Sequence, residues 1–279
     1  MDTSAYILFI KKSFELKKEI EKNIKNKRKT ALPRQKEALT MKKFLGILFL
    51  LIIVAAGVCA YLFPGIPYKY KCTHELQTTD SLWNDTPGDL QPISGETADY
   101  SNFGLKLTAW DDMKPVRTDS KDSAMWQNGD EIHRIGISEK HLSESEDFLD
   151  RTGISHEALD KYCRAVEKTT PESEYEFTKL VMSLNMEDFD IHNFKNSKTF
   201  YQLMKCKNES YIDESDPARY YSVDGVGFRG YLNTIETPDG YTAHVFLYPE
   251  REKRTRYIIK ISTENFGDIF TIADSIKLT

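Results

Sequence analysis

One run of twenty residues without a charged side chain, Phe44 to Phe63, constrains this chain more than any other feature. An α-helix rises about 1.5 Å per residue, so a helix of this length matches the roughly 30 Å hydrocarbon core of a bilayer. The run therefore predicts a single transmembrane helix that contacts the lipid bilayer from Phe44 to Phe63. It also divides the rest of the chain between two sides of a membrane.

Charge is distributed unevenly on the two sides of this run. Residues 1–43 carry 13 Lys and Arg against 5 Asp and Glu, whereas residues 64–279 carry 25 basic and 38 acidic side chains. An excess of Lys and Arg marks the cytoplasmic flank of a membrane span. We therefore expect a single-pass protein of the cell membrane, with a cytoplasmic N-terminus and an extracytoplasmic C-terminal domain. The acidity of that domain argues against nucleic acid as a partner.

The apolar run is open to three interpretations. A cleaved signal peptide usually has an apolar core of about 7–15 residues, which is shorter than this run. A bacterial lipoprotein would have a small residue before its cysteine, but Val58 precedes Cys59. An uncleaved signal anchor that follows Met41-Lys42-Lys43 fits the pattern best.

Residues 1–43 form a basic cytoplasmic segment, and the sequence leaves two interpretations of it open. Phe14, Leu16, Ile20 and Ile24 recur at near-helical intervals among lysines, which is typical of an amphipathic arm on an anionic membrane face. The other interpretation is that translation begins at Met41 and that residues 1–40 are an upstream extension.

The outer region divides at about residue 98. Residues 64–98 are rich in Thr, Asp, Ser, Pro and Gly and are predicted to be a tether. Residues 99–279 alternate between strand and helix patterns and are predicted to form one α+β domain. Alternating apolar residues predict strands at 103–110 and 131–137.

A helical middle follows these strands. Leu159, Tyr162, Cys163 and Val166 recur at helical spacing after Ser155, a plausible N-cap. A second helix is expected to start at Thr170-Pro171, and a third, shorter helix is expected around 200–204.

The last sixty residues give the clearest pattern. Strands are expected at 225–235, 241–248 and 254–262, with Thr237-Pro238-Asp239-Gly240 as the turn of the first hairpin. In the third strand, Thr255, Tyr257, Ile259 and Ile261 share one face, and Arg254, Arg256 and Lys260 share the other. A closing helix at 266–276 would cover one face of this meander. The fold class is therefore α+β, with a mixed, largely antiparallel sheet and flanking helices, preceded by one transmembrane helix.

This order of elements, with a closing helix that ends in Ile272-Ala273-Asp274-Ser275-Ile276, resembles the PsbP-like fold of small exported domains. The group includes the photosystem oxygen-evolving subunit P. The resemblance is strongest over residues 219–279 and looser over 100–140. It implies a mixed, largely antiparallel sheet with flanking helices and a non-enzymatic, partner-binding role.

The sequence contains no motif for catalysis, for a cofactor or for a metal. Its six histidines are not in the H-x-x-x-H or H-E-x-x-H spacings that bind zinc. Its acidic clusters lack the alternating ligands and central glycine of a calcium loop. There is no G-x-S-x-G nucleophile motif and no glycine-rich phosphate loop. We therefore predict no catalytic residue, no cofactor and no metal ligand.

One surface is a candidate binding site. If Asp239-Gly240 forms a two-residue turn, a polar and aromatic set shares one sheet face: Arg229, Tyr231, Asn233, His244, Phe246 and Tyr248. If the turn is instead a three-residue loop with a bulge, the pairing shifts and the two faces mix differently. This face could bind a protein or a small ligand outside the cytoplasm. The alternative is that the helical middle of the same domain covers it, since strongly aromatic sheet faces are usually packed.

Three cysteines follow the apolar run, namely Cys72, Cys163 and Cys206. An oxidising compartment would permit a disulfide, most plausibly between Cys163 and Cys206. Free buried thiols are the simpler expectation, because three cysteines in this length are far from a disulfide scaffold.

Three functions are compatible with these patterns. The sequence favours a membrane-anchored binding or interaction module that is not an enzyme. A membrane-tethered hydrolase with dispersed carboxylates and histidines is the first alternative. The second is a signalling anchor in which the basic N-terminal arm meets a partner at the inner face.

Overall fold

The structure is a computed structural model. It describes residues 11–12, 15–23, 35–88, 93, 95, 97–100, 103–116, 121–141, 147–150, 152–212, 219–251 and 255–279. The chain divides into two compact units. The N-terminal unit comprises Met1–Gln77, Glu157–Lys168 and Asp188–Tyr201, and the sheet unit comprises Thr78–His156, Thr169–Glu187 and Gln202–Thr279. Neither unit coincides with the domain predicted at 99–279.

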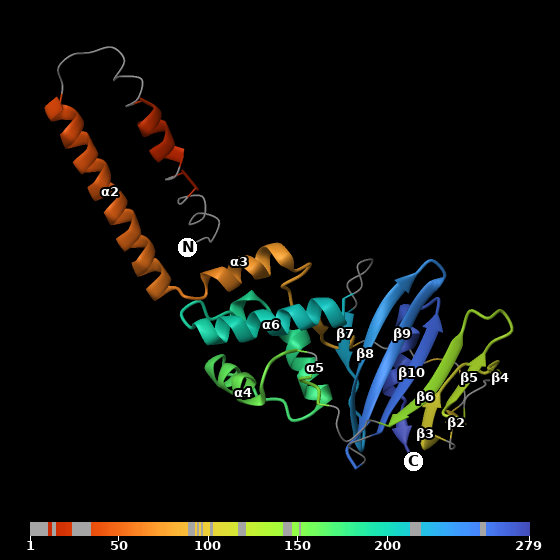
Figure 1. Cartoon of the computed structure of the whole chain (residues 1–279). Helices are drawn as coiled ribbons and strands as arrows, with labels where there is room; N and C mark the ends of the chain where they lie inside the picture. The colour runs from red at the N-terminus through yellow and green to blue at the C-terminus, as the bar shows by residue number, and fades with distance from the viewer. Residues whose placement is uncertain are drawn as a thin grey trace. The chain divides into compact units, whose positions relative to one another are not determined.

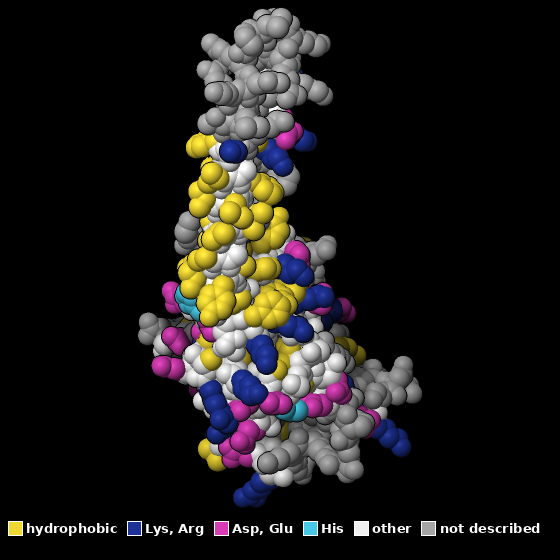
Figure 2. Space-filling view, turned by 60° about the vertical axis from the view of Figure 1, so that its left-hand side comes forward, with side chains coloured by type: hydrophobic (Ala, Val, Ile, Leu, Met, Phe, Trp, Pro, Cys, Tyr) yellow, Lys and Arg dark blue, Asp and Glu magenta, His cyan; other side chains and the backbone are white. Residues whose placement is uncertain are grey.

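Helix α2 of the N-terminal unit runs from Gln35 to Leu62. Its segment Lys43–Leu62 is long and apolar enough to cross a membrane, and none of it is buried within the described part of the chain. Figure 2 shows this segment as a rod covered by hydrophobic side chains. We refer to Lys43–Leu62 as the apolar segment. It agrees with the predicted run to within one residue at each end.

The predicted tether begins with a helix, so this prediction is wrong at its N-terminal end. Helix α3 (Ile66–Glu75) starts directly after the apolar segment, with Pro67 in its first turn. The ring of Tyr68 packs against Phe194 and Tyr201, at centroid distances of 5.3 and 5.8 Å. The hydroxyl of Tyr201 donates a hydrogen bond of 2.6 Å to Glu75. Phe194 and Tyr201 are distant from α3 in sequence. The composition of residues 64–98 alone therefore suggested a tether without regular structure.

Helix α4 (His156–Ala165) buries the predicted stripe of Leu159, Tyr162 and Cys163. Helix α6 (Phe194–Ser210) follows the short 3-10 helix η2 (Met186–Asp188) and is much longer than predicted. Its start is capped by an asparagine. Asn193 Oδ1 accepts hydrogen bonds from the backbone N–H groups of Lys195 and Asn196, at 3.0 and 3.2 Å.

The sheet unit contains an eight-stranded sheet in the order β1-β7-β8-β9-β10-β6-β5-β4, and a three-stranded sheet in the order β11-β3-β2. Figure 1 labels strands β2 to β10 of these sheets. Neighbouring strands are antiparallel except β1 and β7, which are parallel. This is the predicted mixed, largely antiparallel arrangement. The strands are β1 (Trp83–Asn84), β2 (Thr97–Tyr100), β3 (Leu105–Thr108), β4 (Lys114–Val116), β5 (Ser123–Gln127), β6 (Arg134–His141), β7 (Arg219–Ser222), β8 (Phe228–Thr237), β9 (Gly240–Pro249), β10 (Thr255–Thr263) and β11 (Lys277–Leu278).

The C-terminal meander and its predicted hairpin turn, Thr237-Pro238-Asp239-Gly240, are confirmed, but the residues at the tip of the turn differ from the Asp239-Gly240 pair considered for the polar sheet face. Thr237 pairs with Gly240, so the two loop residues are Pro238 and Asp239 rather than Asp239 and Gly240. Gly240 has a φ of 124°, and a Cβ there would lie 2.5 Å from the carbonyl oxygen of Thr263. Only glycine tolerates this geometry. Relative to an Asp239-Gly240 turn, the register between β8 and β9 is shifted by two residues. Side chains alternate between the two faces of a strand, so a shift of two leaves each of them on its predicted face.

The core of the sheet unit lies on one face of the large sheet. Helix α7 (Phe266–Asp274) contacts β9, β10 and β3, which confirms the predicted closing helix. Strand β10 buries Tyr257, Ile259 and Ile261 in this core, as its alternation predicts. Arg254, which was predicted to lie on the opposite face of that strand, is outside the described residues.

Helix α5 (Glu174–Ser183) begins later than predicted. Its N-cap is Ser173, whose side chain accepts a hydrogen bond of 3.2 Å from the backbone N–H of Glu176. Glu176 in turn accepts from the backbone N–H of Glu172 at 2.8 Å. Ser173-x-x-Glu176 is therefore a capping pattern that the sequence displayed, and it outweighed the Thr170-Pro171 signal.

Candidate functional site

The predicted binding face is assembled by strands β8 and β9. Their register pairs Arg229 with Tyr248, Tyr231 with Phe246, and Asn233 with His244. Directly paired residues of antiparallel strands point to the same side of the sheet. All six predicted residues therefore share the face opposite the core. We call this set the aromatic face.

Helix α5 and strand β1 cover part of the aromatic face. Tyr231 is only 4% exposed and lies 6.4 Å from the ring of Trp83 in β1. Tyr175 of α5 lies 6.1 Å from Tyr248. Burial raises the pKa of Tyr231 and of Tyr248 well above the ordinary value of a tyrosine. This half of the aromatic face is therefore covered by the helical middle, which was the second of the two interpretations that the sequence left open.

Two ion pairs join α5 to the same face. Glu174 accepts a hydrogen bond of 2.7 Å from Arg256 of β10, whose side chain is mostly buried. Glu176 lies 3.4 Å from Arg229, where both side chains are more exposed. The buried pair is the stronger of the two, because exposed pairs are screened by water. The first turn of α5 is therefore fixed to the sheet by charge as well as by aromatic packing.

The other half of the aromatic face is more open. His244, Phe246 and Asn233 are each only half-buried. Burial, and then the charge of Lys260, lowers the pKa of His244 below its ordinary value. His244 is therefore neutral near pH 7 and presents one donor and one acceptor nitrogen. Phe246 stacks on Tyr231 at 4.9 Å and lies under the guanidinium of Arg256 at 5.7 Å.

Three buried polar atoms of this face have no hydrogen-bond partner of good geometry among the described residues. They are Asn233 Oδ1, the Tyr248 hydroxyl and Arg256 Nε. Tyr248 is nevertheless close enough to Arg256 and Tyr231 for both to influence its pKa. Buried polar groups are nearly always paired in proteins. Side-chain contacts of Tyr248 with Arg256 and Tyr231, and of Asn233 with Tyr220, provide such partners within the same cluster. The aromatic face therefore combines aromatic surface with a buried polar cluster.

Sequence reasoning missed three residues of this face. Arg256 was placed opposite Tyr257 within its own strand, but its position beside Phe246 depends on the pairing of β9 with β10. Trp83 lies in the range that was predicted to be a tether, and Tyr220 lies in β7, which was not predicted. Tyr220 lies 5.9 Å from Tyr231. The pairing of β7 with β8 brings Tyr220 to this face, and the pairing of β1 with β7 adds Trp83.

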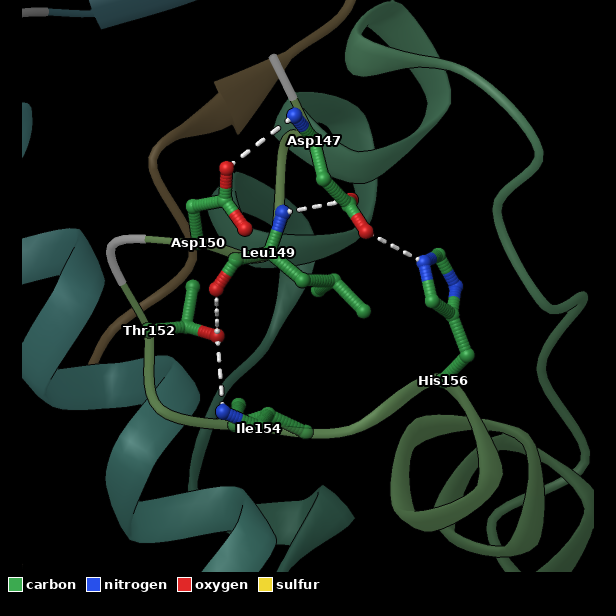
Figure 3. A network of polar contacts seen from close by, with 6 residues as sticks. All are labelled: Asp147, Leu149, Asp150, Thr152, Ile154 and His156. Atoms are coloured by element: carbon green, nitrogen blue, oxygen red, sulfur yellow. Dashed lines mark hydrogen bonds and ion pairs between the residues drawn. The ribbon is translucent and has the colours of Figure 1, made fainter. Parts of the chain in front are cut away.

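A second polar cluster lies in the loop before α4 (Figure 3). Asp147 Oδ2 is 2.6 Å from Nε2 of His156, and its other oxygen accepts a hydrogen bond of 2.9 Å from the backbone N–H of Leu149. The Leu149 bond, followed by the contact with His156, lowers the pKa of Asp147. Thr152 Oγ1 donates to the carbonyl of Leu149 at 2.8 Å and accepts from Ile154 at 3.0 Å. The bonds of Leu149, Thr152 and Ile154 close turns in the loop, and the side chains of Asp147 and His156 are both exposed. We therefore interpret the cluster as one that stabilises the conformation of this loop.

The chain offers little else for chemistry in its described part. No group of three or more His, Cys, Asp and Glu side chains among these residues is arranged to hold a metal ion. The four cysteines, all of which the structure describes, form no disulfide, so Cys163 and Cys206 are not joined by the bond that the sequence left open. Burial raises the pKa of the Cys72 thiol to about 12, which keeps it protonated and unreactive.

Comparisons with known proteins add no family. No family model matches the chain, and none of the curated proteins matches it. A crystal structure of a protein from Bacteroides thetaiotaomicron VPI-5482 is similar over 67% of this chain, with 8% sequence identity and a TM-score of 0.29. The chain spans about half of that protein, 49% of its length. These comparisons do not support the resemblance to the PsbP-like fold, which stays a prediction.

Proposed function

We propose that this chain is a single-pass membrane protein that displays its sheet unit outside the cytoplasm as a non-enzymatic binding module. The apolar segment carries this proposal, because an apolar helix of this length that the described part of the chain leaves unburied is unfavourable in water. The basic excess of residues 1–43 favours a cytoplasmic N-terminus. An uncleaved signal anchor would account for both features.

The open half of the aromatic face is the proposed binding surface. Phe246 offers apolar area, and the neutral His244 and the amide of Asn233 offer hydrogen bonds at its edge. A protein or a small ligand outside the cytoplasm fits this combination. No residue of the face has the nucleophile–base geometry of a hydrolase, so the binding role is preferred.

Extraction of membranes with alkaline carbonate tests the anchoring. We expect the full-length chain to remain in the membrane pellet without detergent, because the apolar segment is inserted in the lipid. The matched control is the double variant Leu50→Arg, Ile53→Arg. Each arginine near the centre of a helix costs roughly 2.5–3.5 kcal/mol of insertion free energy, so this variant should move to the supernatant. Recovery of the unsubstituted chain in the supernatant would contradict the proposal.

A further inference from the structure

The end of the apolar segment is joined to folded structure by a very short connection. The segment ends at Leu62, and α3 begins at Ile66. The three residues between them reach at most about 10 Å even when fully extended. The polar layer on each side of the hydrocarbon core is roughly 5–8 Å thick. If the apolar segment spans the bilayer, the first turn of α3 therefore starts within or directly above the lipid headgroups.

A segment distant in sequence is bound to this connection. The backbone N–H of Gly65 donates a hydrogen bond of 2.9 Å to the carbonyl of Ile191. His192 donates from Nδ1 to the carbonyl of Leu62 at 3.0 Å, and its ring lies 5.2 Å from that of Phe63. The Leu62 carbonyl belongs to the last turn of α2, where it has no partner within the helix. The segment Asp190–Phe194 thus provides hydrogen-bond partners for the backbone at the end of the apolar segment and just after it.

Gly65 makes this approach possible. A Cβ at this position would collide with Ser197 Oγ and lie 2.9 Å from two backbone atoms of Ile191. Its φ of −79° is accessible to any residue, so space rather than backbone conformation requires glycine here. By contrast, a Cβ at Gly57 within the apolar segment would meet nothing within 4 Å. The contact between Gly65 and Ile191 is therefore a close backbone junction.

The side chains at this junction have the character of a membrane interface. Phe194 is 50% exposed and Tyr61 is 84% exposed, although both are large aromatic residues. Tyr68 packs edge-on against Phe194 and continues the aromatic surface. Lys195 and Lys198, both exposed, follow Phe194 on one side of α6. Aromatic residues with adjacent lysines are typical of the headgroup level of a bilayer.

We propose that the segment Asp190–Phe194 lies in the headgroup layer of the outer leaflet and that Phe194 contacts lipid. It acts as a second membrane-contacting element, more than 125 residues after the apolar segment in sequence. This inference rests on the proposed membrane anchoring. The contacts with residues 62–65 determine how deeply the segment Asp190–Phe194 lies in the membrane. As a result, α3 and the start of α6 lie on the membrane surface and are not held away from it by a tether.

Fluorescence quenching by brominated lipids tests this placement. The full-length Phe194→Trp variant is reconstituted in phosphatidylcholine vesicles with or without bromine on the acyl chains close to the headgroup. The unsubstituted chain, with its native Trp83, Trp110 and Trp126, gives the background. We expect about a twofold loss of the added fluorescence, as for an interfacial aromatic residue. A Tyr61→Trp variant gives the signal expected at the end of the apolar segment.

Two further variants test the junction itself. Gly65→Val in the Phe194→Trp background should relieve most of the quenching, because it forces Ile191 and Ser197 away from the connection. The matched control Gly57→Val should leave the quenching unchanged. If the introduced indole of the Phe194→Trp variant is not quenched while the chain stays with the vesicles, this inference is overturned and the anchoring is left intact. A chain that does not stay with the vesicles would overturn both, and equal quenching in the Gly65→Val and Gly57→Val variants would refute the role of the junction.

Discussion

At the scale of single residues, the most informative side chain is a buried charge. Lys207 of α6 is fully buried, and its ammonium group donates hydrogen bonds to the carbonyl of Leu184, at 2.9 Å, and to the carbonyl of Asp80. Helix α5 ends just before Leu184, so this bond satisfies a carbonyl group beyond a helix end. A lysine is rarely buried unless such partners are present. The sequence displays it as one of many lysines, with no mark of its role.

Replacement of this lysine should therefore destabilise the sheet unit. We expect Lys207→Met, which keeps the length of the side chain, to lower the free energy of unfolding by about 2 kcal/mol, because two carbonyl groups lose a charged donor. Lys205→Met on the same helix is the control. Among the described residues, Lys205 forms an exposed pair with Glu209 at 3.4 Å, and its loss should cost no more than about 0.5 kcal/mol. The urea midpoints of the full-length variants in detergent measure both changes, and equal midpoints would refute the assigned role.

At the scale of elements, strands and helices were predictable where the signal was local. The β8–β10 meander and α7 follow from alternation and helical periodicity, and α4 buries its predicted stripe. Helix α3 was not found, because its apolar residues are few and its packing depends on Phe194 and Tyr201. Strands β1 and β7 are too short to show a clear alternation in the sequence, and they are recognised as strands mainly by their pairing. The aromatic face could thus be predicted as a set of residues, but its division into covered and open halves could not.

This division predicts different results for two residues that stack on each other. We expect Tyr231→Ser to lower the free energy of unfolding by about 3 kcal/mol, because it opens a cavity beneath Trp83 and Tyr220. Phe246→Ser removes a half-buried ring from the open half and should cost about 1 kcal/mol. Thermal and urea unfolding of the two full-length variants measure the difference. If Phe246→Ser were as destabilising as Tyr231→Ser, the whole face would be packed and the open binding surface would be refuted.

At the scale of the whole molecule, charge and hydropathy predict an orientation in the membrane. The basic residues 1–43 and the acidic residues 64–279 flank the apolar segment. The orientation can be tested by labelling introduced cysteines, because the native thiols should react little. Cys72, Cys163 and Cys206 are buried, and Cys59 lies in the apolar segment.

Cysteines introduced on each side should therefore report the orientation. In cells that express the full chain, Val226→Cys should react with a membrane-impermeant maleimide, since Val226 is 95% exposed in the turn before β8. Glu19→Cys should react only after permeabilisation, because the positive-inside rule keeps its segment in the cytoplasm. The unsubstituted chain controls for the native thiols. The reverse labelling pattern would contradict the proposed topology.

The sequence by itself determined the apolar segment, the asymmetry of charge around it and the elements of the C-terminal meander. These depend on composition and on spacing over a few residues, which local physical chemistry decides. Only the tertiary structure decided that Asp190–Phe194 meets the end of the apolar segment, that Lys207 is buried between two carbonyls, and that α5 covers half of the aromatic face. Those contacts join residues far apart in the chain, and no local pattern encodes which distant groups will satisfy a given carbonyl or cover a given ring.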